Sequence, residues 1–147
     1  MPRVILHQPE IPQNTGNIGR LCVATNTPLY LVEPLGFFLD DAQIRRSGLD
    51  YWPHLQLQVV PNFATIKQQF PKNRFWFLTT RTRRTYTSVR FQPDDFLVFG
   101  SESRGLPEAL WRDCPDAVIS VPMPGPVRSL NLATTVGIVL YEALRQL

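Results

Sequence analysis

The sequence predicts an α/β fold in which helices flank a mostly parallel sheet. Short apolar runs alternate with segments whose apolar residues recur at helical spacing, the pattern typical of successive βα units. Two runs, Arg74–Thr79 and Asp95–Gly100, have continuously apolar centres, as expected for strands covered on both faces. The 147 residues contain no internal repeat and no low-complexity linker, so we expect a single domain over residues 1–147.

The first half of the chain predicts three strands and three helices. The strands are Val4–His7, Leu29–Val32 and Leu55–Val60, the last with alternating apolar and polar residues. The helices run from about Thr15 to Asn26, from near Asp40 to Ser47, and from the capping residue Asn62 through Phe70. In the first helix, Gly16 and Gly19 indicate close helix packing, and Cys22 fits a buried position.

The second half predicts three further strands and two helices. After the strands Arg74–Thr79 and Asp95–Gly100, Pro107 begins a brief helix that ends near Arg112. The last strand is Ala117–Val121. A final helix runs from about Leu130 to the last residue, Leu147.

Composition excludes several classes of protein. No apolar run approaches the ~18 residues of a membrane span, and the first residues turn polar too soon for a secretory signal. Two cysteines, Cys22 and Cys114, make neither a disulfide framework nor a metal site. We therefore expect a cytoplasmic protein with no membrane association and no metal.

The cations are mostly arginine, and they are clustered. Fifteen Lys and Arg against twelve Asp and Glu give a net charge of +3. Clusters lie at Arg45–Arg46 and Arg81–Arg84, with Arg90 nearby. Arginine recognises phosphate through two parallel hydrogen bonds, which favours a nucleic acid partner, although a solvated basic face is an alternative for any one cluster.

Three loops at expected strand ends are candidates for ligand binding, because ligands of parallel sheets bind beyond the carboxyl ends of the strands. They are Thr79–Arg81, Gly100–Gly105 and Pro122–Ser129. Alternating prolines stiffen the third loop, and Gly100 permits close approach of backbone to a ligand. Neither a Rossmann nor a P-loop glycine fingerprint occurs.

One predicted helix has a polar face, and another is apolar over most of its surface. Asn17, Arg20 and Ala24 share one face of the first helix, with Asn14 one turn earlier, and this face either is solvated or lines an active site. The last helix is apolar over most of its circumference, from Leu132 to Leu147. This is typical of a helix buried on two sides, either within the domain or in a two-fold dimer.

Three segments together resemble the motifs of SPOUT-class RNA 2′-O-ribose methyltransferases. They are Asn-Thr-Gly-Asn-Ile-Gly-Arg at 14–20, the segment 97–107 around Gly-Ser-Glu-Ser-Arg-Gly, and the segment 119–132 ending in Arg-Ser-Leu-Asn-Leu. The sequence is most similar to the small members that act on the tRNA wobble nucleotide, cytidine or uridine 34. These also carry the patterns found here at 9–12, 33–37 and 45–51.

The resemblance implies a fold, a cofactor and an assembly. The family has a C-terminal trefoil knot that binds S-adenosylmethionine, and it works as a homodimer through the C-terminal helix, to which Tyr141 belongs. The resemblance implies tRNA as the substrate. Two segments depart from the family pattern, Gly125–Val127 and Ala133–Thr134, which affects only the fine contacts with the cofactor.

The resemblance also assigns roles to residues. It implies that backbone of Leu78, Gly100 and Val121 holds the cofactor, with Met123 and Ser129 closing the pocket. It places Asn14, Glu102, Arg128 and Asn131 behind the contact residues or facing the RNA. Arg20 matches the catalytic arginine, and because a guanidinium holds its proton too tightly to act as a base, we interpret Arg20 as stabilising the forming alkoxide.

Two other classes of function remain open from the residues. One is an RNA-binding module without catalysis, and a methyltransferase acting at another RNA position is a related alternative. The other is a nucleotide-binding hydrolase or transferase of a different α/β family, against which the missing phosphate loop argues.

Overall fold

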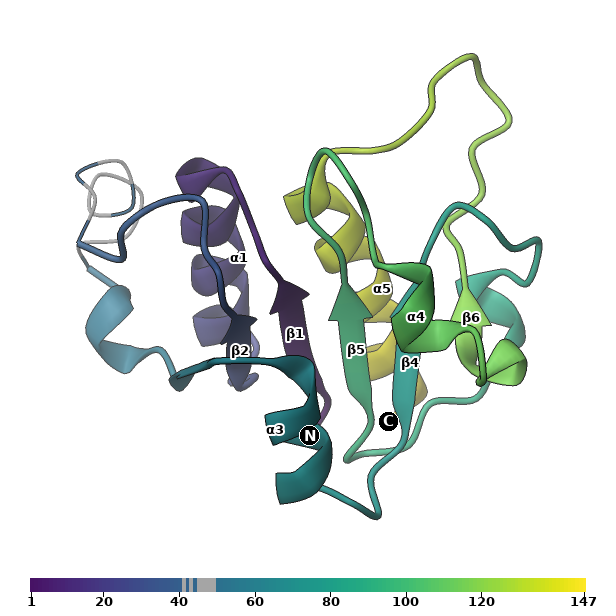
Figure 1. The fold of residues 1–147 in the computed structure, drawn as a ribbon, viewed down its shortest axis with the longest axis horizontal. Coiled ribbons are helices and arrows are strands. Elements are labelled where there is room, and N and C mark those ends of the chain that lie inside the picture. The colour runs from purple at the N-terminus through teal and green to yellow at the C-terminus, as the bar shows by residue number, and fades with distance from the viewer. Residues whose placement is uncertain (41, 43, 45–49) are drawn as a thin grey trace.

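The computed structural model describes residues 1–40, 42, 44 and 50–147, whose strands form a six-stranded sheet (Figure 1). The strands are β1 (Arg3–His7), β2 (Leu29–Val32), β3 (Leu57–Val60), β4 (Phe75–Leu78), β5 (Phe96–Phe99) and β6 (Val118–Ile119), in the order β3-β2-β1-β5-β4-β6. Neighbouring strands all pair in parallel. The predicted fold class is confirmed.

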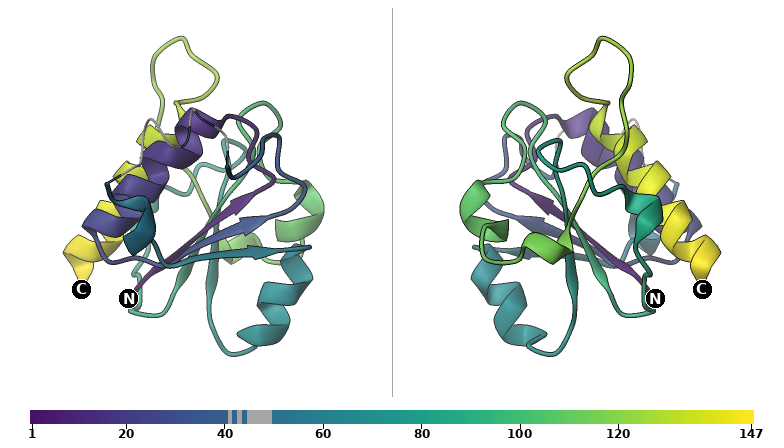
Figure 2. Two further views of the ribbon diagram at one scale, coloured as in Figure 1. Left: turned by 90° about the vertical axis from the view of Figure 1, so that its left-hand side faces the viewer. Right: turned by 90° about the vertical axis from the view of Figure 1, so that its right-hand side faces the viewer.

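Two layers of helix cover the sheet (Figure 2). Helices α1 (Pro12–Ala24) and α5 (Leu132–Gln146) lie on one face, and α3 (Phe63–Gln69) and α4 (Glu108–Trp111) on the other. Alternate residues of β1 divide accordingly: Val4 and Leu6 pack in the cluster with α1 and α5, and Ile5 packs with α3. Burial on both faces explains why the central strands are apolar throughout.

One predicted helix boundary differs from the structure, and another agrees with it. Helix α1 begins at Pro12 rather than near Thr15, because proline suits the first helical turn, where its missing N–H is not needed. Asn62 caps α3 as predicted, accepting a hydrogen bond from Thr65 N at 2.9 Å. Most of the predicted helix near residues 40–47 lies outside the described residues. The Arg45–Arg46 pair lies outside them entirely.

Two predictions about the first helix are confirmed. Cys22 is 1% exposed in the core between α1 and the sheet. Gly19 lies against the Trp52 ring, and an added Cβ would be 3.0 Å from that ring, so the glycine serves close packing.

The end of β6 lies between two parts of one chain segment. Thr79 N donates to Ile119 O at 3.0 Å on the β4 side. On the other side, Ser120 N donates to Arg84 O at 2.8 Å, and Tyr86 N donates to Ser120 O at 2.9 Å. Residues 119–120 are therefore held on both sides by the stretch that runs from β4 to Tyr86.

The other predicted elements are also present: β2 has the predicted bounds, β1 begins one residue earlier than predicted, at Arg3, and the rest are shorter. Strand β6 covers only Val118–Ile119, and α5 begins at Leu132 after the capping residue Asn131. Among the described residues, no helix is long and apolar enough to span a membrane.

Candidate active site

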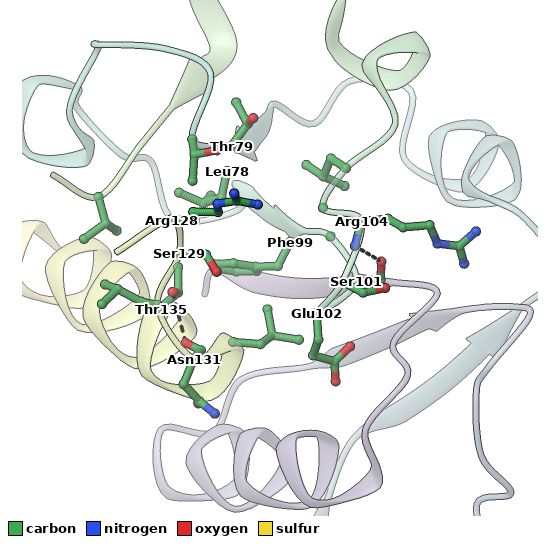
Figure 3. A pocket seen from close by; sticks show the side chains of 18 of the residues that line it. Leu78, Thr79, Phe99, Ser101, Glu102, Arg104, Arg128, Ser129, Asn131 and Thr135 are labelled. Carbon is green, nitrogen blue, oxygen red and sulfur yellow. Dashed lines mark hydrogen bonds between the residues drawn. The ribbon is translucent and has the colours of Figure 1, made fainter. Parts of the chain in front are cut away.

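A pocket of about 570 Å³ opens where β4, β5 and β6 end, a size typical of small-molecule sites (Figure 3). The three loops predicted from the sequence all contribute to it, because the carboxyl ends of parallel strands meet at one edge of the sheet. The first turns of α1 and α5 close its remaining side. The pocket is lined by Ile11, Asn14, Leu78–Arg81, Phe99–Leu106, Ser120, Val121, Met123, Arg128–Leu132 and Thr135.

The pocket brings together most of the residues predicted for the site. The five cofactor candidates all line it, namely Leu78, Gly100, Val121, Met123 and Ser129. So do Asn14, Glu102, Arg128 and Asn131. Two predicted residues, Arg20 and Tyr141, lie outside it.

Gly100 serves the fold of its own loop. An added Cβ would lie 2.1 Å from Gly105 C and 2.2 Å from Leu106 N, and both distances are far shorter than the contacts that Cβ atoms make. The loop folds back here through a bridge between Ser101 and Gly105, and Gly105 has a positive φ of 67°. The predicted reason for Gly100, close approach to a ligand, is therefore incomplete, because its missing side chain is needed for contact with the chain itself.

The Glu102 carboxylate caps the start of α1 from a distant loop. Its Oε1 accepts from Glu10 N at 2.8 Å, and its Oε2 accepts from Ile11 N at 2.8 Å and from Asn14 Nδ2 at 3.2 Å. Helix α1 has no side-chain cap of its own, so this carboxylate takes that place. Glu102 therefore both lines the pocket and holds the entry to α1 in place.

Glu10 completes a reciprocal clamp between the two segments. Its Oε1 accepts from Ser103 N at 3.0 Å and from Ser103 Oγ at 2.6 Å. These hydrogen bonds hold the pKa of the Glu10 carboxyl below its usual range. Two sets of hydrogen bonds, one to the Glu102 carboxylate and one to the Glu10 carboxylate, therefore fix the loop after β5 to the entry of α1.

A third link joins α5 to this network. Asn131 Oδ1 accepts from Thr134 N at 3.1 Å and caps α5, while its Nδ2 donates to Asn14 Oδ1 at 3.0 Å. Asn14 is only 7% exposed and lines the pocket, so of the two alternatives for its position, a solvated face and the wall of a site, the structure favours the second.

The pocket rim is cationic. Arg81, Arg104 and Arg128 come from three different loops, and all are exposed while lining the pocket. Figure 3 shows the Arg128 guanidinium near the centre of the view and the Arg104 side chain extending away to the right. Arg84 pairs with Asp116 at 3.4 Å, on the exposed surface beyond the rim. Such a rim favours an anionic ligand or polymer.

Arg20 lies on the exposed face of α1, six residues beyond Asn14 and so about 9 Å farther along the helix. Its guanidinium carbon is 5.9 Å from the centre of the Tyr51 ring. The Tyr51 hydroxyl donates to Gly16 O on the same helix. Burial raises the pKa of Tyr51, opposed by the nearby Arg20 charge.

Comparison with known proteins identifies the family. A model of the SpoU rRNA Methylase family matches residues 1–141. The chain belongs to this family. The resemblance read from the sequence is confirmed, and family membership makes the protein a methyltransferase.

Several relatives are similar over nearly their whole length. The chain is 46% identical to a tRNA (cytidine(34)-2′-O)-methyltransferase of Methylovorus glucosotrophus, covering 97% of this chain and 94% of the relative. It is 43% identical to the protein of that name from Aeromonas hydrophila, covering 98% and 93%.

Two solved structures bear on the site. One, described as "Structural insights into the 2-OH methylation of C/U34 on tRNA", matches with a TM-score of 0.94 and 46% identity over 99% of this chain and 95% of that one. Another, the SpoU methyltransferase AviRb from Streptomyces viridochromogenes in complex with the cofactor AdoMet, matches with a TM-score of 0.87 and 25% identity. This chain spans 57% of AviRb.

The region around the pocket and Arg20 also contains residues that sequence reasoning missed. Glu10 and Ser103 form the clamp, and Tyr51 supports Arg20, yet none was predicted to have a role. Glu10 and Tyr51 fall within the segments 9–12 and 45–51 that resemble family patterns, which was the available signal. Among the described residues, no group of three or more His, Cys, Asp or Glu side chains is placed to hold a metal ion.

Proposed function

We propose that this protein transfers a methyl group from S-adenosylmethionine to the ribose 2′-oxygen of the wobble nucleotide, cytidine or uridine 34, of tRNA. The observation that carries the proposal is the match to the C/U34 methylation structure, which is 46% identical and covers 95% of that chain. The relatives named tRNA (cytidine(34)-2′-O)-methyltransferase, which are 43–46% identical over nearly their whole length, support the same substrate.

The pocket fits an adenosine joined to an amino acid. Its floor is apolar, formed by Leu78, Phe99 and Val121, and suits the flat face of a base. The hydroxyls of Ser129 and Thr135 stand beside this floor and suit the ribose and amino-acid portions (Figure 3). Bound S-adenosylmethionine would supply a methyl group on a positively charged sulfur, an electrophile that needs no metal.

The residues of this chain then have to orient the ribose and stabilise negative charge. We assign Arg20 to the 2′-oxygen and its neighbouring phosphate, because a guanidinium offers several donors in one plane. An RNA that covers both the pocket mouth and the exposed face of α1 contacts Arg20 and the rim arginines together. The proton of the 2′-hydroxyl passes to a substrate phosphate or to water, since the arginine does not accept it.

We also propose a homodimer through α5 and a trefoil knot. The dimer is supported by the Tyr141 side chain, which is 54% exposed on a helix whose other side is buried in the core. The knot is supported by residues 119–120, which lie between β4 and the segment around Arg84–Tyr86. Light scattering of the protein with and without a charge at Tyr141 tests the dimer. A monomer in the unmodified protein contradicts it.

Mapping of methylated nucleotides tests the activity. Purified protein is incubated with unmodified tRNA and isotope-labelled S-adenosylmethionine, and the RNA is digested and analysed by mass spectrometry. We expect a single labelled 2′-O-methyl group at nucleotide 34. Label at another tRNA position or in rRNA would change the assigned substrate. RNA binding without cofactor binding would favour the non-catalytic RNA-binding module.

A further inference from the structure

One aromatic side chain stands out on the described surface because it lies mostly in solvent. Phe38 is 80% exposed, more than any other large hydrophobic residue of the described surface. It belongs to the segment 33–40, which leaves the carboxyl end of β2. Single exposed apolar residues are common, so the position and the anchoring of Phe38 decide whether it has a role.

The backbone that carries Phe38 is anchored on both sides. Leu35 and Leu39 pack against the core cluster beneath α1 and α5. Gly36 N donates to Pro9 O at 2.9 Å, and an added Cβ at Gly36 would lie 2.8 Å from Glu10 Cα. A side chain held out from a fixed backbone loses little conformational freedom when it binds a flat partner.

This segment lies beside the proposed active site. It leaves the same edge of the sheet as the pocket loops, because β2 is parallel to β1 and β5. Strand β2 is two positions from β5, which places the loops about 10 Å apart at their roots. Glu10 contacts the segment through Gly36 and contacts the pocket through Ser103.

We propose that Phe38 is a stacking platform for an unpaired base of the RNA substrate, a base other than the one whose ribose enters the pocket. Proteins recognise single-stranded RNA by stacking bases on exposed aromatic side chains. The exposed neighbours Glu33 and Asp40 are acidic and repel phosphate, so the contact at Phe38 is with a base. The rim arginines on the same edge bind the phosphates.

The other exposed residues of the described segment 33–40 favour a base over a protein partner. Besides Phe38, the exposed residues of the segment 33–40 are Glu33, Pro34, Gly36 and Asp40. An apolar docking surface needs a contiguous patch, and none of these residues provides one.

Three variants and one control test the stacking. The RNA probe is an anticodon stem-loop with 2-aminopurine replacing one loop base at a time. Stacking is worth about 1–3 kcal/mol per base, so Phe38→Ala should weaken RNA binding about 5- to 150-fold. Phe38→Leu should weaken it nearly as much, because an aliphatic side chain offers no flat face, and Phe38→Trp should retain it. Gln68→Ala, a change at an exposed residue of α3 on the face of the sheet away from α5, should leave RNA binding unchanged.

Two further measurements separate stacking from other roles. One labelled position should lose fluorescence on binding to the unmodified protein and to Phe38→Trp, and should keep it with Phe38→Leu. The rate at saturating RNA and the affinity for S-adenosylmethionine should not change. Equal RNA binding by Phe38→Leu and the unmodified protein overturns the proposal. So does a change in oligomeric state without a change in RNA binding, which indicates a protein contact.

The inference rests on an RNA substrate but can fail separately from the proposed function. If the protein methylates nucleotide 34 and the Phe38 variants bind RNA normally, only the stacking platform is wrong. If the unmodified protein binds no stem-loop and methylates no tRNA, the proposed function fails first.

Discussion

The Asn131 side-chain nitrogen lies 3.0 Å from Asn14 Oδ1, and this hydrogen bond joins the first turn of α5 to the first turn of α1. The two residues are 117 positions apart in the sequence. Since Asn14 also donates to Glu102, the helix starts and the loop after β5 form one connected wall of the pocket. Changes to this wall should affect cofactor binding without removing any residue of the pocket floor.

Two substitutions at Asn131 should separate its two hydrogen bonds. Asn131→Asp keeps an oxygen to cap α5 but loses the donor to Asn14. Asn131→Ala loses both and should lower the free energy of unfolding by about 1 kcal/mol through the cap alone. Urea denaturation should therefore show the larger loss for Ala, whereas calorimetry should show weakened S-adenosylmethionine binding for both. Unchanged cofactor affinity in both variants would show that the link to Asn14 is not needed.

Glu102→Gln should uncap α1. The carboxylate accepts from three donors through its two oxygens. The amide of glutamine has only one oxygen, and its NH₂ group cannot accept the remaining hydrogen bonds. Hydrogen bonds to a charged group contribute about 1.5–3 kcal/mol, so we expect a loss of stability in that range. Thermal denaturation measures it, and Glu108→Gln is the control, because Glu108 is an exposed carboxylate that pairs with the exposed Arg112. Equal stability of the two variants would contradict the capping role.

Substitution by alanine should affect stability very differently at two glycines near the pocket. At Gly100 the added methyl would overlap backbone of Gly105 and Leu106, so Gly100→Ala should cost about 1–3 kcal/mol or more and distort the loop. At Gly125 an added Cβ has no neighbour within 4 Å, and Gly125→Ala should change stability by no more than about 1 kcal/mol. Chemical denaturation compares them. A stable Gly100→Ala protein would mean that the loop has another conformation.

Arg20→Ala should reduce single-turnover methyl transfer about 100- to 1,000-fold at saturating tRNA, because a preorganised charge is lost. Arg20→Lys should recover little of this, since an ammonium lacks the planar fork. Tyr51→Leu removes the ring beside Arg20 and should slow transfer about 2- to 5-fold, while Tyr51→Phe keeps the ring. Cofactor affinity should stay unchanged throughout. A normal rate for Arg20→Ala would mean that Arg20 takes no part in methyl transfer.

The two cysteines should differ in reactivity. Burial raises the pKa of Cys22 to about 12, so its thiol stays protonated and shielded well above neutral pH. Cys114 is only partly buried. At pH 8, iodoacetamide followed by mass spectrometry should label Cys114 first and Cys22 only on unfolding. Labelling of Cys22 at the same rate in the folded protein would indicate opening of α1 from the sheet.

The sequence predicted the sheet and pocket loops well because local patterns specify them. Continuous apolar strands such as Phe96–Phe99 reveal burial on both faces, and the prolines and Gly100 mark the loops at their ends. The pairing of Glu102 with Glu10 and Ile11 was not predictable, since it joins residues more than 90 positions apart and no periodicity records it. The burial of Asn14 was not predictable for the same reason, as it depends on partners in two distant segments.

The direction of α5 has a consequence for how the molecule can be held. The helix begins at the pocket and its 15 residues run back about 22 Å toward the opposite edge of the sheet, where Met1 also lies (Figure 1). A tag or tether attached to residue 1 or residue 147 therefore leaves from the side away from the pocket. Anchoring the protein to a sensor surface by either end should leave the pocket mouth facing the solution and accessible to a large polymer.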